Sequence, residues 1–171
     1  MTTKDYNIID VINEVADDIN NVLNKRQVEE YFTSIVLLYS FIENLLIWLV
    51  YAKLLWDRAG SGLGKKDVVI IREYCNQLSF HSASQLAFAV RVFDSQTFER
   101  VNAVKLERNR IVHQFWLYEH RKKRHILRKK LEKLAGIANE LVSTFNKLVR
   151  KTGADRTYRF FIIRPKKGFL I

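Results

Sequence analysis

A single apolar run decides the fold, and it reads YFTSIVLLYSFIENLLIWLVYAKLLW from Tyr31 to Trp56. The run is long enough to cross a bilayer, since a membrane helix needs about 20 apolar residues. Against a membrane span, Glu43 and Asn44 lie at its centre, and an acid there costs roughly 2.5–3.5 kcal/mol on insertion. Its seam alternates spacings of three and four residues, which is typical of a helix packed against protein; the seam is Ile35, Leu38, Ile42, Leu45, Leu49, Ala52 and Trp56. The run is therefore predicted to be a core helix, one that could also line a subunit interface.

The composition of the whole chain favours an all-α fold. The 171 residues include one proline and six glycines, and 48% of them are hydrophobic. So few turn-forming residues make a many-stranded sandwich or barrel improbable, while the apolar content is ample for a core. We therefore predict one helical domain over residues 1–153, followed by a short extension over residues 154–171.

Periodicity and capping signals divide this domain into helices. We predict helices over residues 6–23, 26–58, 67–78 and 83–93, with a flexible linker at 59–64 and a break at 79–84. A further helix begins at a cap within 94–99 and runs toward Tyr118, and a last helix begins near Glu119 or His120. The seam of the last helix is Leu127, Leu131, Leu134, Ala138, Leu141, Phe145 and Leu148. In the extension, the strand-like run 158–163 could pair with 169–171 as a short β-hairpin packed on the bundle.

The charge is unevenly distributed along the chain. Residues 1–57 carry a net charge of −5, whereas residues 58–171 carry +16. Such a gradient indicates a polyanionic partner, either a nucleic acid or an anionic membrane surface, unless it serves solubility alone.

Cysteine usage points to a reducing compartment. Cys75 is the only cysteine, so no intrachain disulfide can form, and no cleavable signal sequence is evident. We therefore expect a cytoplasmic protein without a membrane span.

Metal binding is weakly supported by the histidines. His81, His113, His120 and His125 include no pair at i,i+4 spacing, and no second cysteine exists. We expect neither a metal nor another cofactor.

The segment most suggestive of chemistry is Arg108-Asn109-Arg110-Ile111-Val112-His113. On a helix, Asn109 and His113 share a face, so the amide could bond the imidazole and fix its tautomer. Arg108 points about 140° away from His113 and lies about 7.5 Å along the axis. One straight helix cannot easily aim both groups at one atom, whereas a kinked helix or a second copy of the chain could.

Arg108-Asn109-x-x-x-His113 resembles the Arg-x(4–6)-His signature of the HEPN superfamily, in the form with a polar residue after the arginine. The resemblance covers about residues 5–150 and includes a very apolar second helix carrying Glu43. It implies an antiparallel helical bundle that forms a homodimer and brings two motifs together in a cleft. Many members are metal-independent endoribonucleases, among them toxins with a cognate antitoxin and antiviral defence factors; others are non-catalytic binding modules.

The residue types suit the chemistry that the resemblance implies. Cleavage of RNA by its 2′-OH needs proton transfer, which a histidine can perform near neutral pH. Arginine binds phosphate oxygens in a bidentate manner and stabilises developing negative charge. The candidate catalytic set is therefore Arg108, His113, Asn109 and Glu43. Glu43 has two interpretations, since it could pair with Arg108 inside the bundle or make a structural polar contact.

A basic run downstream of the motif is the candidate RNA-binding surface. Seven of the ten residues 121–130 are Lys or Arg, and Phe115, Trp116 and Tyr118 precede them as stacking surfaces or as core residues. With the neighbouring Arg110, the predicted contacts are Arg121, Lys122, Lys123, Arg124, Arg128, Lys129 and Lys130. The run could instead be a solvated helix face. The rival functions are a non-catalytic RNA- or protein-binding module and a structural component of a helical assembly.

Overall fold

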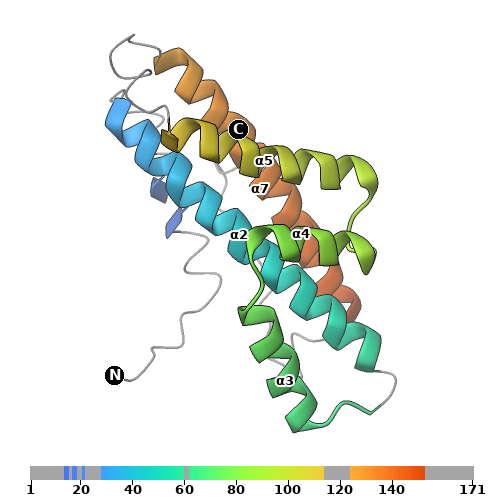
Figure 1. Ribbon diagram of the computed structural model, residues 1–171. Coiled ribbons are helices and arrows are strands. Elements are labelled where there is room, and N and C mark those ends of the chain that lie inside the picture. The colour runs from blue at the N-terminus through green and yellow to red at the C-terminus, as the bar shows by residue number, and fades with distance from the viewer. Residues whose placement is uncertain are drawn as a thin grey trace, which may run out of the picture.

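The computed structural model shows a helical bundle (Figure 1) and describes residues 14–15, 17–18, 21, 28–59, 62–113 and 124–152. Its elements are α2 (Val28–Ala59), α3 (Lys65–Asn76), α4 (Phe80–Ala89), α5 (Ser95–His113) and α7 (Arg124–Thr152). All elements of these described ranges are helices, which confirms the all-α prediction. The predicted β-hairpin and the rest of the extension lie outside the described residues, as does most of the predicted helix 6–23.

The long helix α2 forms the centre of the bundle. Its predicted seam is buried from Ile35 to Ala52, and only Trp56 at the far end is 40% exposed. Within the described residues, α2 alone is long and apolar enough to cross a membrane, but more than half of its apolar window is buried in the fold. A core helix of a soluble protein has these properties, in agreement with the sequence-based interpretation.

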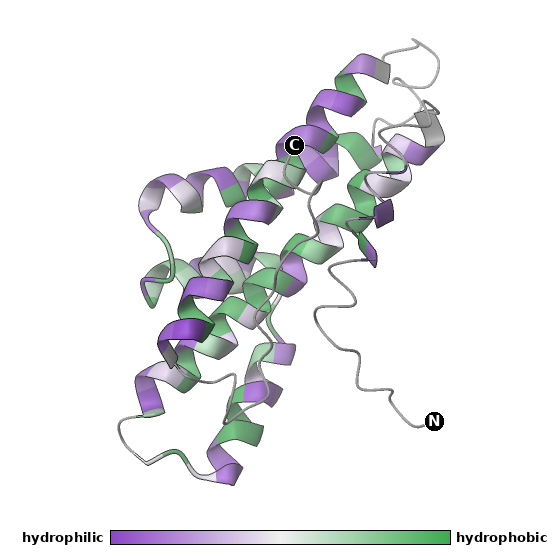
Figure 2. Cartoon of the chain, turned by 180° about the vertical axis from the view of Figure 1, so that it is seen from behind, coloured by the Kyte–Doolittle hydropathy of each residue, from purple (hydrophilic) through white to green (hydrophobic). Residues whose placement is uncertain are grey.

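Helix α7 packs along much of α2, and both are the longest helices of the described chain (Figure 1). Its predicted seam is confirmed, because every member from Leu127 to Phe145 is buried and Leu148 packs against the core. Hydrophobic residues follow the facing sides of these helices, while hydrophilic residues cover the outer turns (Figure 2). Burial of this apolar surface is the main favourable term in folding.

The shorter helices begin at side-chain caps. Asp67 accepts a hydrogen bond from the Gly64 backbone N–H (2.9 Å) before α3, and Ser79 accepts from Ser82 N–H (3.3 Å) at α4. Asp94 accepts from Thr97 N–H (2.8 Å) at α5, as its sequence predicted. The break predicted over 79–84 is wrong beyond Ser79, because this cap lets α4 begin at Phe80.

The turn between α4 and α5 contains a residue in an uncommon conformation. Arg91 has a φ of 58°, in the left-handed region. Its N–H bonds the Phe88 carbonyl (2.9 Å) and the next N–H, of Val92, bonds the Ala87 carbonyl (2.8 Å). This pattern is a Schellman motif, in which the left-handed position is usually glycine. A residue with a Cβ costs about 1–2 kcal/mol there.

Candidate functional site

Helix α5, which carries the motif, is anchored to α7 and α4 by polar contacts. Thr97 donates its hydroxyl to Glu140 of α7 (2.9 Å), and Arg100 binds the same carboxylate (2.6 Å). On the other side, Ser84 of α4 donates to the Asn102 side-chain oxygen (3.2 Å). These contacts join α5 to both of its neighbours, and together with the buried Val101, Val104 and Ile111 they orient one face of α5 into the bundle.

Arg108 points toward α2. Its guanidinium carbon lies 4.9 Å from the centre of the Tyr39 ring, a cation–π contact. Its Nη1 donates to Asn109 Oδ1 (3.2 Å), and its Nε is buried without a hydrogen bond in the part of the chain that the structure describes. Arg108 is thus held at the edge of the bundle with part of its donor capacity unused.

Tyr39 is the centre of a small cluster around this arginine. Its ring stacks on Phe80 of α4, with centroids 5.0 Å apart. Burial raises the pKa of the Tyr39 hydroxyl, the nearby Glu43 carboxylate raises it further, and Arg108 opposes both effects. These charges therefore act on one another across α2 and α5.

Glu43 makes a structural contact. Its Oε1 accepts a hydrogen bond from the backbone N–H of Phe80 (2.8 Å), the first residue of α4. A carboxylate at a helix N-terminus satisfies a free backbone N–H and interacts favourably with the positive end of the helix dipole. Of the two interpretations of Glu43, this bond supports the structural polar contact; its carboxylate still acts electrostatically on Tyr39, which contacts Arg108.

His113 is the last residue of α5, and it is exposed. It lies on the solvent side of a helix whose Val104 and Ile111 are buried, whereas the half-buried Arg108 contacts α2. The two motif residues therefore diverge, as their spacing predicts. The expected bond from Asn109 to the imidazole is replaced by the bond from Arg108 to the Asn109 oxygen.

The predicted RNA-binding residues have different environments. Arg121, Lys122 and Lys123 lie outside the described residues, and so does the side chain of Arg124. Lys129 and Arg110 are exposed, as phosphate contacts require. Arg128 is exposed but pairs with Glu132 (2.9 Å) one turn along α7.

Lys130 is the exception among the predicted RNA contacts. It forms an ion pair with Glu107 of α5, and only 18% of its side chain is exposed. Burial lowers the pKa of Lys130, and the charge of Lys133 lowers it further. This lysine links α5 to α7 through an ion pair, and its contact with RNA stays a prediction.

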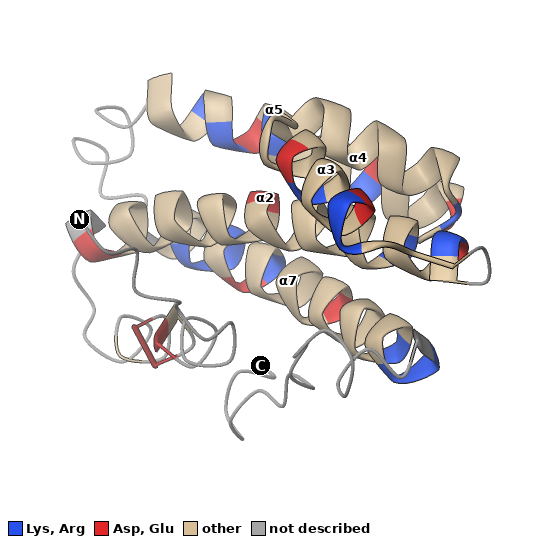
Figure 3. Cartoon of the chain, turned by 90° about the horizontal axis from the view of Figure 1, so that it is seen from below, with Lys and Arg blue, Asp and Glu red and all other residues tan. Residues whose placement is uncertain are grey.

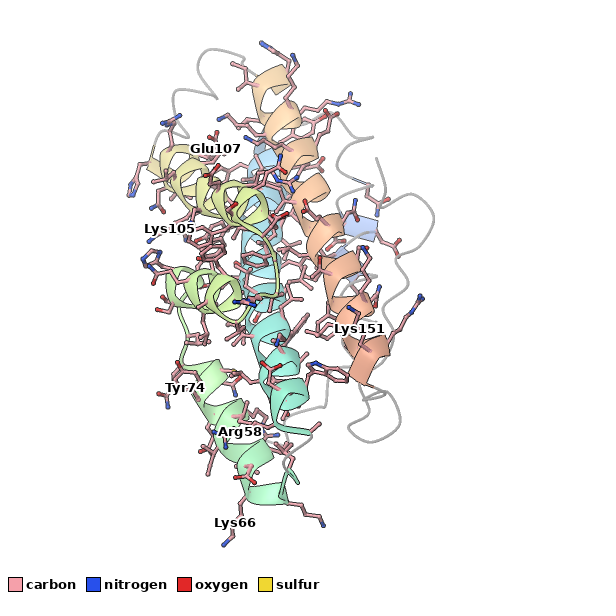
Figure 4. The ribbon with its side chains drawn as sticks, turned by 90° about the vertical axis from the view of Figure 1, so that its right-hand side faces the viewer. Arg58, Lys66, Tyr74, Lys105, Glu107 and Lys151 are labelled. Carbon is pink, nitrogen blue, oxygen red and sulfur yellow. The ribbon has the colours of Figure 1, made fainter. Side chains whose placement is uncertain are left out.

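A pocket of about 360 Å³ lies beside this ion pair, between α5 and α7. Its apolar lining is formed by Ala103, Val104, Ile126, Leu134 and Ile137, and its polar lining by Glu107, His125, Lys129, Lys130 and Lys133. Figure 4 shows Glu107 on the part of α5 nearest to the start of α7. Tyr39 and Lys133 were not predicted from the sequence, although Tyr39 stands one turn before Glu43 and Lys133 one turn after Lys129.

The candidate site is thus an edge of the helical bundle that carries a half-buried arginine, an exposed histidine and nearby cations. Within the described residues, no three His, Cys, Asp or Glu side chains gather closely enough to hold a metal ion. Searches for related proteins returned no matching family model, curated protein or solved structure.

Proposed function

We propose that this protein is a cytoplasmic, metal-independent endoribonuclease, a HEPN-like toxin or antiviral defence factor that cleaves RNA by attack of the 2′-OH. The observation that carries the proposal is the placement of the motif: His113 is exposed at the end of α5, and Arg108 is half-buried against Tyr39 of α2. Their divergence favours a composite site in a homodimer. A cognate antitoxin or a defence-system protein would be its partner.

The proposed reaction needs two proton transfers. One His113 takes the proton from the 2′-OH as its oxygen bonds to phosphorus, and the bond from phosphorus to the 5′-oxygen breaks. The second copy's His113, protonated, gives its proton to that leaving oxygen. The products are a 2′,3′-cyclic phosphate and a 5′-hydroxyl.

Arg108 would stabilise the negative charge that develops on the phosphoryl oxygens. The N–H donors of a guanidinium lie in its plane, so Arg108 would bind phosphate while it keeps its contact with the Tyr39 ring. A hydrogen bond to a charged group contributes about 1.5–3 kcal/mol. The contact with Tyr39 is therefore compatible with catalysis, because it would hold the guanidinium in position while the phosphate is bound.

A second candidate function is a non-catalytic module that holds RNA or a partner protein. The contacts of Arg108 with Tyr39 and Asn109, and of Glu43 with α4, favour it, because both residues have structural partners. The two functions differ in one measurable property, which is cleavage of RNA by the purified chain.

The test is mass spectrometry of a short RNA incubated with the purified chain in EDTA. We expect cyclic-phosphate ends, and a loss of about 10²–10⁴-fold in rate for His113→Ala. His81→Ala is the matched control, because His81 is also an exposed helical histidine. Ends with 5′-phosphate, or equal rates for His113→Ala and the wild type, would refute the mechanism.

The composite site has its own test. Sedimentation at micromolar concentration should show a dimer, because one copy cannot supply both proton-transfer groups. A strictly monomeric chain with full nuclease activity would contradict the shared site.

A further inference from the structure

A second cavity, of about 250 Å³, lies away from the motif, where three segments meet. It is formed by the last turns of α2, the turn after α4 and the last turns of α7. Its charged lining residues are Lys53, Arg91, Lys147 and Lys151, and Trp56 contributes an indole that is 40% exposed. Tyr39 and Lys53 lie about 21 Å apart along the axis of α2, so the cavity is distinct from the site around Arg108.

The lining of this cavity is strongly cationic. Among the described residues, four basic side chains line it without an acidic one, and of these four Lys53 has an ion pair, with Asp57 outside the lining. Lys147 and Lys151 are one turn apart on α7, where like charges repel. Lys151 lies in the last turn of α7, far from the Glu107 end of the bundle (Figure 4), and Figure 3 shows basic residues at that end of α7.

Helix ends alone do not account for these cations. The C-termini of α2, α4 and α7 each carry about −0.5 of a charge, and this acts only over the last turn. Lys53 and Lys147 lie more than one turn before their helix ends. Among the described residues, Asp57 and the three helix ends leave about one to two of the four positive charges uncompensated, which suits an anionic ligand.

Arg91 supports a ligand role by its backbone conformation. It occupies the left-handed position of the Schellman motif, where glycine would relieve strain. Its side chain lines the cavity instead. Residues held in such conformations are concentrated at functional sites.

We propose that this cavity binds a nucleotide, with the base against Trp56 and the phosphate on Arg91, Lys147 and Lys151. An aromatic face accepts any base, and cations one turn apart suit a phosphate. The ligand is one nucleotide unit, either free or within an RNA strand. The inference is separate from the ribonuclease proposal, because it concerns binding alone.

The decisive variant is Arg91→Gly, for which affinity and stability should change in opposite directions. Affinity for AMP, measured by calorimetry with the full chain, should fall about 10- to 100-fold. The midpoint of thermal unfolding should stay the same or rise by about 2–4 °C, because glycine adopts this φ without strain. Unchanged affinity in Arg91→Gly would overturn the proposal. If the glycine variant fails to fold, Arg91→Asn gives the same test, because asparagine also tolerates this conformation.

Further variants separate the base from the phosphate. Trp56→Leu should weaken AMP binding by about 5- to 150-fold. The double variant Lys147→Ala, Lys151→Ala should reduce the salt dependence of AMP binding. The matched control is Lys66→Ala on α3, which should bind AMP as the wild type does. Inorganic phosphate binding as tightly as AMP would overturn recognition of the base.

The ligand's source is decided by comparing AMP with 5′-phosphorylated penta-adenylate, methylated at each 2′-OH so that it cannot be cleaved. Tighter binding of the oligomer, lost in Arg91→Gly, would assign the cavity to RNA; equal binding would assign it to a free nucleotide. Absence of binding of both at millimolar concentration would overturn the proposal.

Discussion

Arg108 of α5 lies over the ring of Tyr39 of α2, with the guanidinium carbon 4.9 Å from the ring centre. The same ring stacks on Phe80, whose backbone N–H is bound by Glu43. The motif arginine is thereby connected to α2 and α4 through one aromatic residue. Any catalytic or binding role of Arg108 therefore depends on Tyr39.

Replacing Tyr39 should affect function through the position of Arg108. Tyr39→Leu removes the cation–π contact, so RNA cleavage should fall about 2- to 30-fold, corresponding to about 0.5–2 kcal/mol. Tyr39→Phe keeps the ring and should restore the rate, while both variants remain helical by circular dichroism. Equal rates for the two variants would show that the ring does not position Arg108.

Replacing Glu43 should affect stability more than chemistry. Glu43→Ala leaves the first N–H of α4 without its acceptor and should lower the free energy of unfolding in urea by about 1–3 kcal/mol. Glu43→Gln keeps an acceptor and should lose less than half of that. A loss of cleavage in Glu43→Gln with unchanged stability would instead indicate a catalytic carboxylate.

The two neighbouring lysines of α7 should behave differently. Lys129 is exposed, so Lys129→Ala should weaken RNA binding and reduce the slope of affinity against salt, with stability unchanged. Lys130→Ala removes the partner of the half-buried Glu107 and should destabilise the fold by about 1–3 kcal/mol. Filter binding at several salt concentrations and urea unfolding measure the two effects. The reverse assignment would show that Lys130 is the RNA contact.

Cys75 should be unreactive in the folded protein. Burial raises the pKa of its thiol from 9.0 to about 11, and the side chain is 1% exposed. At pH 8 a thiol reagent should therefore react roughly 100-fold more slowly with the folded chain than with the chain unfolded in urea.

The same pKa shift makes stability depend on pH. The folded state holds the thiol proton more tightly, so this contribution is fully present below about pH 9 and is lost as pH rises through about 11. The raised pKa of Tyr39 acts in the same direction. Cys75→Ala should flatten the decline of stability in this range, and an unchanged decline would assign it to other groups.

The sequence by itself determined the fold class and most of the core. The seams of α2 and α7 are local periodicities, and a helix with such a seam must bury it whatever its neighbours are. The start of α5 was also predictable, because Asp94 caps a backbone N–H three residues away. The divergence of Arg108 and His113 follows from helix geometry alone.

Only the tertiary structure decided the partners of the polar residues. Tyr39 and Arg108, Glu43 and Phe80, and Glu107 and Lys130 lie on different helices, and their pairing depends on how the helices cross and rotate. The cavity around Arg91 also depends on how distant segments pack. The left-handed backbone of Arg91 could not be predicted, because a glycine usually marks this position and none is present here. Local patterns specify which face of a helix is buried, whereas the residue it meets there depends on packing between distant segments.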